Sequence, residues 1–130
     1  MNTPAALKYS KSDEWILVEG NIVTLGVTDY AQEQLSDVVF VEVSVSVDDE
    51  VKINTTVATI ESVKAAADVS LPVSAKVVAV NEALANAPEK INSDPYGEAW
   101  LLKAELKDPS ELTALMDAKA YEEFCQTRSH

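Results

Sequence analysis

Lys64 is the residue whose setting most directly indicates chemistry, and it lies in the run IESVKAAAD over 60–68. Apolar residues alternate on both sides, over 57–60 and 69–73, which predicts two strands with Lys64 at or near the connecting tip. An ordinary lysine ammonium is a poor nucleophile at neutral pH. It is, however, a good site for another enzyme to attach a group through an amide bond. The chemistry would then belong to the attached group, and the protein would supply position and access.

A catalytic site within the chain itself has little support in the sequence. Schiff-base lysines are normally desolvated, whereas Lys64 stands near Glu61 and Asp68, whose carboxylates favour the ammonium form. The glycines are scattered, so there is no phosphate-binding loop, and no Ser-centred nucleophile elbow occurs. The single cysteine and histidine, Cys125 and His130, exclude an intrachain disulfide and a Cys/His zinc site. A Cys–His nucleophilic pair stays formally open, although chain ends usually fray.

The composition limits the classes of partner. A length of 130 residues and 47% hydrophobic content predict one globular domain, 1–130. The net charge of −12 excludes nucleic-acid binding and disfavours anionic membranes, because both need Lys and Arg to neutralise phosphates. No apolar run of about 18 residues and no signal or transit peptide occur, so a cytoplasmic protein is the simplest interpretation. Acidity suits visits to partners with basic patches, but solubility alone would also explain it.

Most of the expected elements are short strands. A hairpin is expected over 15–27, and Thr28 is a suitable cap for a short helix that continues to Leu35. Alternating valines predict one long strand over 38–47. The remaining expectations are strands over 51–60 (broken near Asn54), 69–73, 76–80 and 100–106, a helical segment over 81–84 and irregular chain over 85–95. Many short strands without βαβ alternation predict a mainly β sandwich or flattened barrel.

A C-terminal helix is predicted over about 109–125, after a core over about 7–106. Asp108 is a suitable N-cap, Pro109 takes the first helical position, and Glu111 completes a capping box. Apolar residues then recur at roughly helical spacing and should form one face that packs on the β core. They are Leu112, Leu115, Met116, Tyr121 and Phe124.

Several runs match a known family, and the match extends from residue 7 to about 124. They are LKY at 7–9, EW at 14–15, GVTDYAQEQL at 26–35, VVFVE at 38–42, ESVKA at 61–65, PVS at 72–74, VAVNEAL at 78–84 and NSDPYGEAWLL at 92–102. The chain that carries them resembles the H proteins of the glycine cleavage system. The run around Lys64 alone would be a weak signal, but the combination is specific.

Four positions depart from the pattern of that family. A histidine usually precedes the Glu-Trp pair, where this chain has Asp13. Glycine usually stands where this chain has Ser36, Asp48 and Ala75. Glycine adopts positive φ at low cost, and aspartate tolerates it better than alanine, so Ala75 implies a remodelled turn. None of these positions touches Lys64 in sequence.

The resemblance implies a lipoyl carrier rather than an enzyme. H proteins carry lipoate on the lysine that matches Lys64, and they resemble lipoyl and biotinyl carriers: a flattened β-barrel (barrel-sandwich hybrid), here with an N-terminal hairpin, short helices and a C-terminal helix. The arm accepts the aminomethyl group when glycine dehydrogenase (P protein) decarboxylates glycine. It passes this group to the aminomethyltransferase (T protein) and is reoxidised by dihydrolipoyl dehydrogenase (L protein). A lipoate-attaching enzyme is a fourth partner, and a monomer is expected.

The resemblance also implies two groups of site residues. The attaching enzyme is expected to recognise the turn and its flanks, namely Glu61, Ser62, Val63 and Ala65. In the family the loaded arm folds into a surface cleft, whose polar positions match Ser12, Glu14 and Asp68. A carboxylate can hold a methylamine cation through a charge-assisted hydrogen bond. Exclusion of water there protects a group that hydrolysis would release as formaldehyde.

Two other functions stay open on the sequence alone. Lipoyl domains of 2-oxoacid dehydrogenases typically show Asp-Lys-Ala at the tip and biotin carriers Met-Lys-Met, whereas this chain has Val63, Lys64 and Ala65. The extra N-terminal hairpin and C-terminal helix also argue against both. An H-like lipoate-relay protein that does not serve glycine cleavage would carry the same lysine, so the sequence does not separate it from the first interpretation.

Overall fold

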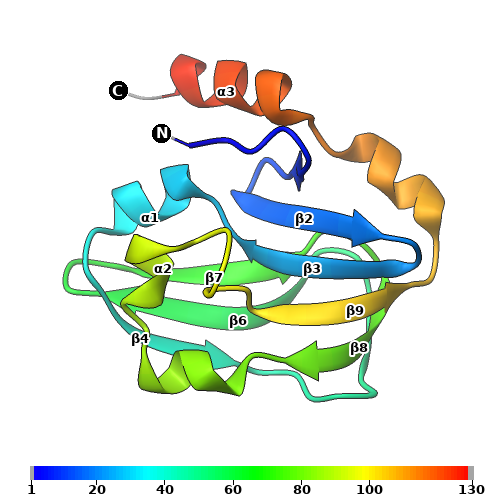
Figure 1. Cartoon of the computed structure of the whole chain (residues 1–130), viewed down its shortest axis with the longest axis horizontal. Coiled ribbons are helices and arrows are strands. Elements are labelled where there is room, and N and C mark those ends of the chain that lie inside the picture. The colour runs from blue at the N-terminus through cyan, green and yellow to red at the C-terminus, as the bar shows by residue number, and fades with distance from the viewer. Residues whose placement is uncertain (1, 129–130) are drawn as a thin grey trace.

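Two antiparallel sheets make up most of the molecule (Figure 1). The structure is a computed structural model and describes residues 2–128. The larger sheet has the strand order β1-β2-β3-β9-β8-β5 and the smaller one β4-β6-β7. The strands are β1 (Lys8–Tyr9), β2 (Glu14–Glu19), β3 (Ile22–Val27), β4 (Val38–Val43), β5 (Glu50–Val51), β6 (Thr55–Ser62), β7 (Ala66–Leu71), β8 (Ala75–Val80) and β9 (Leu102–Leu106). The helices are α1 (Asp29–Leu35), η1 (Glu82–Asn86), α2 (Lys90–Ser93), η2 (Pro109–Ala114) and α3 (Ala118–Thr127).

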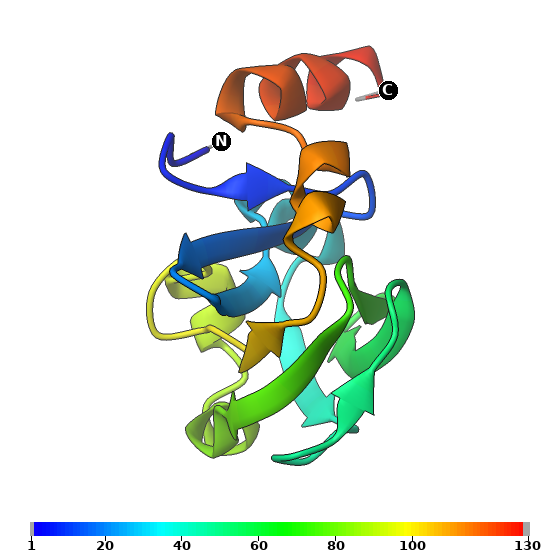
Figure 2. The same ribbon diagram turned by 90° about the vertical axis from the view of Figure 1, so that its right-hand side faces the viewer.

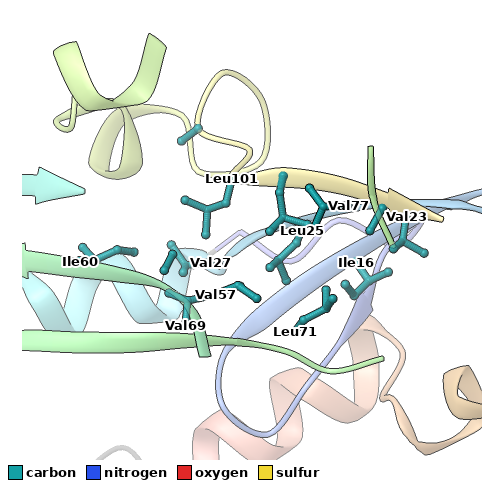
Figure 3. Close-up of a cluster of buried hydrophobic side chains, with 14 of the residues drawn as sticks. Ile16, Val23, Leu25, Val27, Val57, Ile60, Val69, Leu71, Val77 and Leu101 are labelled. Atoms are coloured by element: carbon teal, nitrogen blue, oxygen red, sulfur yellow. The ribbon is translucent and has the colours of Figure 1, made fainter. Parts of the chain in front are cut away.

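The main core lies between the two sheets and confirms the mainly β, carrier-like fold. Figure 3 shows apolar side chains of both sheets gathered in one layer, with Leu25 and Val77 from the larger sheet and Val57 and Leu71 from the smaller. All four are fully buried. Full burial of one such aliphatic side chain contributes about 1.5–3 kcal/mol, so this layer is the principal source of stability.

A second core, rich in aromatic residues, joins the N- and C-terminal segments. Tyr9 and Tyr121 stack with their ring centres 4.7 Å apart, and both are fully buried. Trp15, Cys125 and Leu7 complete the buried part of this cluster. Figures 1 and 2 both show α3 lying over the N-terminal segment, away from the smaller sheet. The cluster therefore attaches α3 to the start of the chain.

The N-terminal elements follow their local sequence signals. β2 and β3 form the predicted hairpin, whose turn contains Gly20 with φ of 64°. Thr28 caps α1, because its Oγ1 accepts a hydrogen bond from the Ala31 amide at 3.1 Å. The strand predicted over 38–47 is shorter, since β4 ends at Val43. A register shift between Val38 and Phe40 also breaks the expected alternation.

The prediction of one helix over 109–125 is wrong. Asp108 does cap η2, but the Glu111 carboxylate accepts from the Ser74 amide at 2.7 Å instead of closing a capping box. Met116 then pairs with Tyr9, with two backbone hydrogen bonds of 2.8 Å, and this extended bridge separates η2 from α3. Asp117 caps α3 afresh. The apolar face is divided accordingly, since Leu112 and Leu115 pack on the main core while Met116, Tyr121 and Phe124 join the aromatic cluster.

Two smaller expectations also need correction. The helical segment expected over 81–84 is the 3₁₀ helix η1. Asn81 makes no side-chain cap there, because its side-chain Nδ2 donates to the Trp100 carbonyl at 2.8 Å. Part of the segment expected to be irregular forms α2. Asn54, where a strand break was expected, has φ of 66° and precedes β6. Within residues 2–128 no helix is long and apolar enough to cross a membrane.

The departures from the family pattern divide into two kinds. Asp13, Ser36 and Asp48 have positive φ values of 72°, 65° and 76°, which glycine adopts at the lowest cost. Ala75 does not share it, because it is the first residue of β8 and pairs with Val51 as an ordinary strand residue. Ala75 therefore has no need of the positive φ that glycine would supply, and its backbone carries no strain of that kind.

Candidate functional site

Lys64 lies in the three-residue connection between β6 and β7, where the sequence predicted it. The Ser62 amide donates to the Ala65 carbonyl at 2.7 Å and closes the hairpin. The Ser62 hydroxyl oxygen accepts from the amides of Ala65 and Lys64 at 3.1 and 3.3 Å. This hydroxyl explains how the turn forms without a glycine, because it satisfies backbone donors that the hairpin leaves free. Val63 and Lys64 are exposed, so the lysine side chain is accessible.

The tip is short and fixed at its base. β6 is the central strand of its sheet and pairs with both β4 and β7. The Val63 amide donates to the Asp37 carbonyl at 3.0 Å, which connects the tip to the segment between α1 and β4. Glu61 is exposed and pairs across the ladder with Ala66. A lysine on such a support has a defined position while its long side chain remains free to move.

A hollow of about 270 Å³ lies beside this tip. Its walls come from the β1–β2 loop, from α1, and from the two strands that carry Lys64. It brings together Ser12, Glu14 and Asp68, the three residues expected in the cleft, with Ala65 of the tip. Its other lining residues are Asp13, Val27, Ala31, Gln34, Leu35, Ile60, Ala67 and Val69. The hollow is thus mostly apolar with carboxylates on its walls, and we call it the cleft.

Glu14 is the most constrained polar residue of the cleft, because only 1% of its surface is exposed. Its Oε1 accepts from the hydroxyls of Ser10 and Ser12 at 2.5 and 2.6 Å, and its Oε2 accepts from the Ser70 amide at 3.1 Å. Burial raises the pKa of Glu14, and the charge of Asp13 adds to this, while the three hydrogen bonds act in the opposite direction. The result is a fixed carboxylate with restricted access to water.

Asp68 and Ser12 are held less tightly. Asp68 is exposed on β7 and accepts one hydrogen bond, from the Thr59 hydroxyl at 3.3 Å. Ser12 is exposed in the β1–β2 loop and donates its hydroxyl to Glu14. Both side chains therefore adapt more readily to a ligand than Glu14 does.

A larger hollow of about 490 Å³ lies between β4 and η1. None of the residues predicted for the cleft or the tip lines it. Its charged lining residues are Glu42 and Glu82, both exposed. The volume of a hollow therefore does not identify the candidate functional site. The smaller hollow is the one that lies beside Lys64 and contains a buried carboxylate.

Comparison with known proteins places this geometry in a family. The family model described as "Glycine cleavage H-protein" matches residues 7–128. The chain belongs to the glycine cleavage H-protein family. Curated proteins named glycine cleavage system H protein share 55% identity over 123 residues in Symbiobacterium thermophilum (95% of each chain) and 54% over 118 residues in Thermotoga maritima (91% of this chain, 94% of that one). A crystal structure of the H protein from Mycobacterium marinum aligns with a TM-score of 0.82 at 30% identity, covering 98% of this chain and 99% of that one.

Membership in the H-protein family confirms the function implied by the resemblance. The chain is a lipoyl-carrier component of glycine cleavage and not a catalyst. The alternatives, a lipoate-relay protein outside glycine cleavage or another lipoyl carrier, are not favoured. The Cys–His nucleophilic pair gains no support, because Cys125 is only 2% exposed inside the aromatic cluster and His130 lies outside the described residues.

Several groups around the H-protein cleft were not identified from the sequence. Ser10 and Ser70 bind Glu14 directly, but a serine in a loop or a strand amide carries no distinctive sequence signal. Asp13 was noticed only as a departure from the family pattern. In the structure its carboxylate accepts the Tyr121 hydroxyl at 2.7 Å and the Arg128 guanidinium. These contacts span more than a hundred residues of sequence, beyond the reach of local patterns.

Proposed function

We propose that the chain carries lipoate in amide linkage on Lys64 and shelters the end of that arm in the cleft. The observation that supports this most is the juxtaposition of an exposed tip lysine with a hollow that contains a buried, hydrogen-bonded carboxylate. The residues fit the group. The apolar lining of the cleft suits a hydrocarbon arm, and Glu14 suits a cationic amine at its end.

The protein contributes position, shelter and charge in this proposal. When attached, lipoate supplies the disulfide and dithiol chemistry by which the aminomethyl group is carried between enzymes. Glu14 would accept a charge-assisted hydrogen bond from the amine, with Ser12 and Asp68 as flexible partners. The buried position of Glu14 limits the access of water to this end of the cleft.

The partners, location and assembly state belong to the same proposal. The P, T and L proteins of glycine cleavage would each receive the arm in turn, which tethering converts into repeated visits by one group. A lipoate-attaching enzyme would act before them. We also propose that the chain works as a single lipoyl-carrier domain, as a monomer, in the cytoplasm.

Recognition by the attaching enzyme would depend on the turn itself. Glu61, Val63 and Ala65 are exposed around Lys64, and Ser62 fixes the backbone between them. Glu61→Lys reverses a charge next to the tip without touching the core, so lipoylation should slow several-fold. Glu105→Lys, an exposed position on β9, is the matched control. Equal lipoylation rates for both variants and the wild type would remove Glu61 from the recognition surface.

The intact mass of protein produced with lipoate and a competent attaching enzyme tests the main proposal. We expect one added lipoyl group, and peptide sequencing should place it on Lys64. The lipoylated protein should then support exchange of labelled bicarbonate into glycine with a P protein. Absence of any modification would mean that the chain has kept the fold and lost the carrier function. Modification without exchange would assign the lipoyl group to another pathway.

A further inference from the structure

The two walls of the cleft meet behind it at one side chain of the C-terminal helix. Tyr121 of α3 is fully buried, and its hydroxyl donates to Asp13 Oδ1 at 2.7 Å in the β1–β2 loop. The same hydroxyl lies 2.6 Å from Thr28 Oγ1, the atom that caps α1. The Thr28 amide also donates to the Asp13 carbonyl at 3.0 Å. Tyr121 therefore connects the loop that leads into Glu14 to α1, the helix that forms another wall of the cleft.

Arg128 holds the same loop from outside. Its guanidinium donates to the Asp13 carboxylate and, at 3.3 Å, to the Lys11 carbonyl. The guanidinium carbon also lies 4.3 Å from the ring centre of Tyr30 and 4.5 Å from that of Phe124. The faces of aromatic rings attract a positively charged guanidinium, and this attraction restricts the motion of the side chain. Two acceptors in one loop and two rings make this a defined contact rather than a flexible surface ion pair.

These contacts act on Glu14 through geometry and through charge. Asp13 has φ of 72° and directly precedes Glu14, so its side chain and backbone determine where the loop turns into β2. On the loop before Glu14, Lys11 and Asp13 are charged, Asp68 lines the cleft from β7, and Arg128 contacts Asp13 from behind the loop. The wall from α1 adds only neutral lining residues. Arg128 pairs with the Asp13 carboxylate, whose charge raises the pKa of Glu14, so the guanidinium offsets that neighbouring charge.

We propose that Tyr121 and Arg128 are positioning residues of the cleft, which hold Asp13 and thereby fix the orientation of the Glu14 carboxylate and offset the charge beside it. The inference deepens the proposed role of Glu14 and rests on it. It gives α3 a function in the site, although no residue of that helix lines the cleft. It also accounts for the aspartate at position 13, which presents a carboxylate to both positioning residues.

The test compares Arg128→Gln with Lys119→Gln, which removes the same charge from α3 at an exposed site. Two quantities are measured on the unmodified protein: the pKa of Glu14 by carbon NMR, and hydrogen exchange of the Glu14 amide, which donates to Ser10 Oγ at 3.0 Å. Arg128→Gln should raise the Glu14 pKa and accelerate exchange about tenfold, the effect of losing one charge-assisted contact. Lys119→Gln should change neither.

Two further variants separate the charge from the geometry. Arg128→Lys keeps the charge but cannot reproduce the planar fork, so the Glu14 pKa should return towards the wild-type value while exchange stays fast. Tyr121→Phe keeps the stacking on Tyr9 and removes only the hydroxyl, so it should accelerate exchange with the charge of Arg128 in place. Should the phenylalanine variant fail to fold, the Arg128 variants still decide.

The inference is overturned if folded Arg128→Gln matches Lys119→Gln in both measurements, because Arg128 would then only hold the end of the helix. Both measurements use protein without lipoate, so their failure leaves lipoylation of Lys64 untouched. Conversely, a chain that is never lipoylated would contradict the proposed function without altering these measurements. In lipoylated and loaded protein, Arg128→Gln should also release the carried amine several-fold faster than Lys119→Gln.

Discussion

The tip and the cleft lie side by side but are built in opposite ways. The tip depends mainly on contacts between residues no more than three apart, such as the bonds from Ser62 to Ala65, with one longer contact from the Val63 amide to the Asp37 carbonyl. The cleft depends on segments far apart in the sequence, since Ser70 and Ser12 bind the same carboxylate and Arg128 supports the loop behind it. In the proposed function, attachment of lipoate would therefore depend mostly on local structure, whereas sheltering its end would depend on contacts across the fold.

The two regions should also differ in their sensitivity to mutation. The tip residues are exposed, and exposed substitutions away from special backbone sites usually change the free energy of unfolding by less than about 0.5 kcal/mol. Glu14 is buried and satisfied by three donors, so each change in its surroundings leaves a polar group without a partner. Substitutions at the tip should therefore alter the carrier function and leave the free energy of unfolding nearly unchanged. Substitutions behind the cleft should alter both the function and the free energy of unfolding.

The largest functional effect is expected for Lys64→Arg. A guanidinium cannot form the amide that joins lipoate to lysine, so lipoylation and carrier activity should fall to background. The free energy of unfolding should change by less than about 0.5 kcal/mol, because Lys64 is exposed. Intact mass, glycine–bicarbonate exchange and thermal melting measure the three quantities. A lipoyl group on another lysine of this variant would show that the tip is not specific.

The largest effect on stability is expected for Gly26→Ala behind the cleft. A Cβ at Gly26 would overlap the indole of Trp15, which is 2% exposed and donates its Nε1 to the Pro95 carbonyl at 2.9 Å. Overpacking of this kind costs about 1–3 kcal/mol. Gly20→Ala is the control, since no atom lies within 4 Å of its Cβ and only its φ of 64° is unfavourable.

Denaturant unfolding of both glycine variants provides the measurement. Gly26→Ala should lose more stability than Gly20→Ala and should also disturb Glu14, which precedes Trp15 directly. Lipoylation of the folded fraction should stay normal, because both positions lie outside the β6–β7 hairpin that carries Lys64. Equal destabilisation by the two variants would mean that Trp15 moves aside easily and that the cleft is less rigid than its packing indicates.

Glu14→Gln should separate charge from shape within the cleft. Because the folded-state pKa of Glu14 is raised, the folded state binds the proton more tightly than the unfolded state does. The stability that protonated Glu14 contributes is fully present below its ordinary pKa of 4.5 and is lost as the pH rises through the raised value. Chemical unfolding across this range should show the loss in the wild type and not in Glu14→Gln.

The same variant should weaken retention of the amine. Loss of a charge-assisted hydrogen bond costs about 1.5–3 kcal/mol, so the loaded protein should release its one-carbon amine at least about tenfold faster. Lipoylation should proceed at the normal rate. An unchanged release rate would remove Glu14 from the proposed role, while an unchanged pH dependence would show that its carboxylate is less buried than the structure indicates.

The sequence was sufficient wherever a structure depends on neighbouring residues. Lys64 at a hairpin tip, the hairpin before Thr28 and the Thr28 cap follow from alternation and from side chains that bind the backbone a few residues away. The family resemblance predicted Ser12, Glu14 and Asp68 as polar residues of a cleft, and in the structure all three line one hollow.

Long-range contacts explain what could not be predicted. The helix expected over 109–125 is interrupted because Met116 pairs with Tyr9, a bond between opposite ends of the chain that overrides helical spacing. The burial of Glu14 depends on the Ser70 amide, and any residue type supplies such an amide. Local propensity carries no information about either contact, since both exist only after the sheets have packed.

Asp68→Asn should have the smallest effect and is the most sensitive test of the contrast between tip and cleft. Asp68 lies on β7 close to the tip but lines the cleft, and its carboxylate accepts a hydrogen bond from the Thr59 hydroxyl at 3.3 Å. Stability should change by less than about 0.5 kcal/mol, because the residue is exposed. Release of the carried amine should accelerate only a few-fold, since water screens an exposed carboxylate. An effect as large as that of Glu14→Gln would mean that the cleft closes over Asp68 when the arm is loaded, so that this carboxylate becomes buried as Glu14 is in the structure.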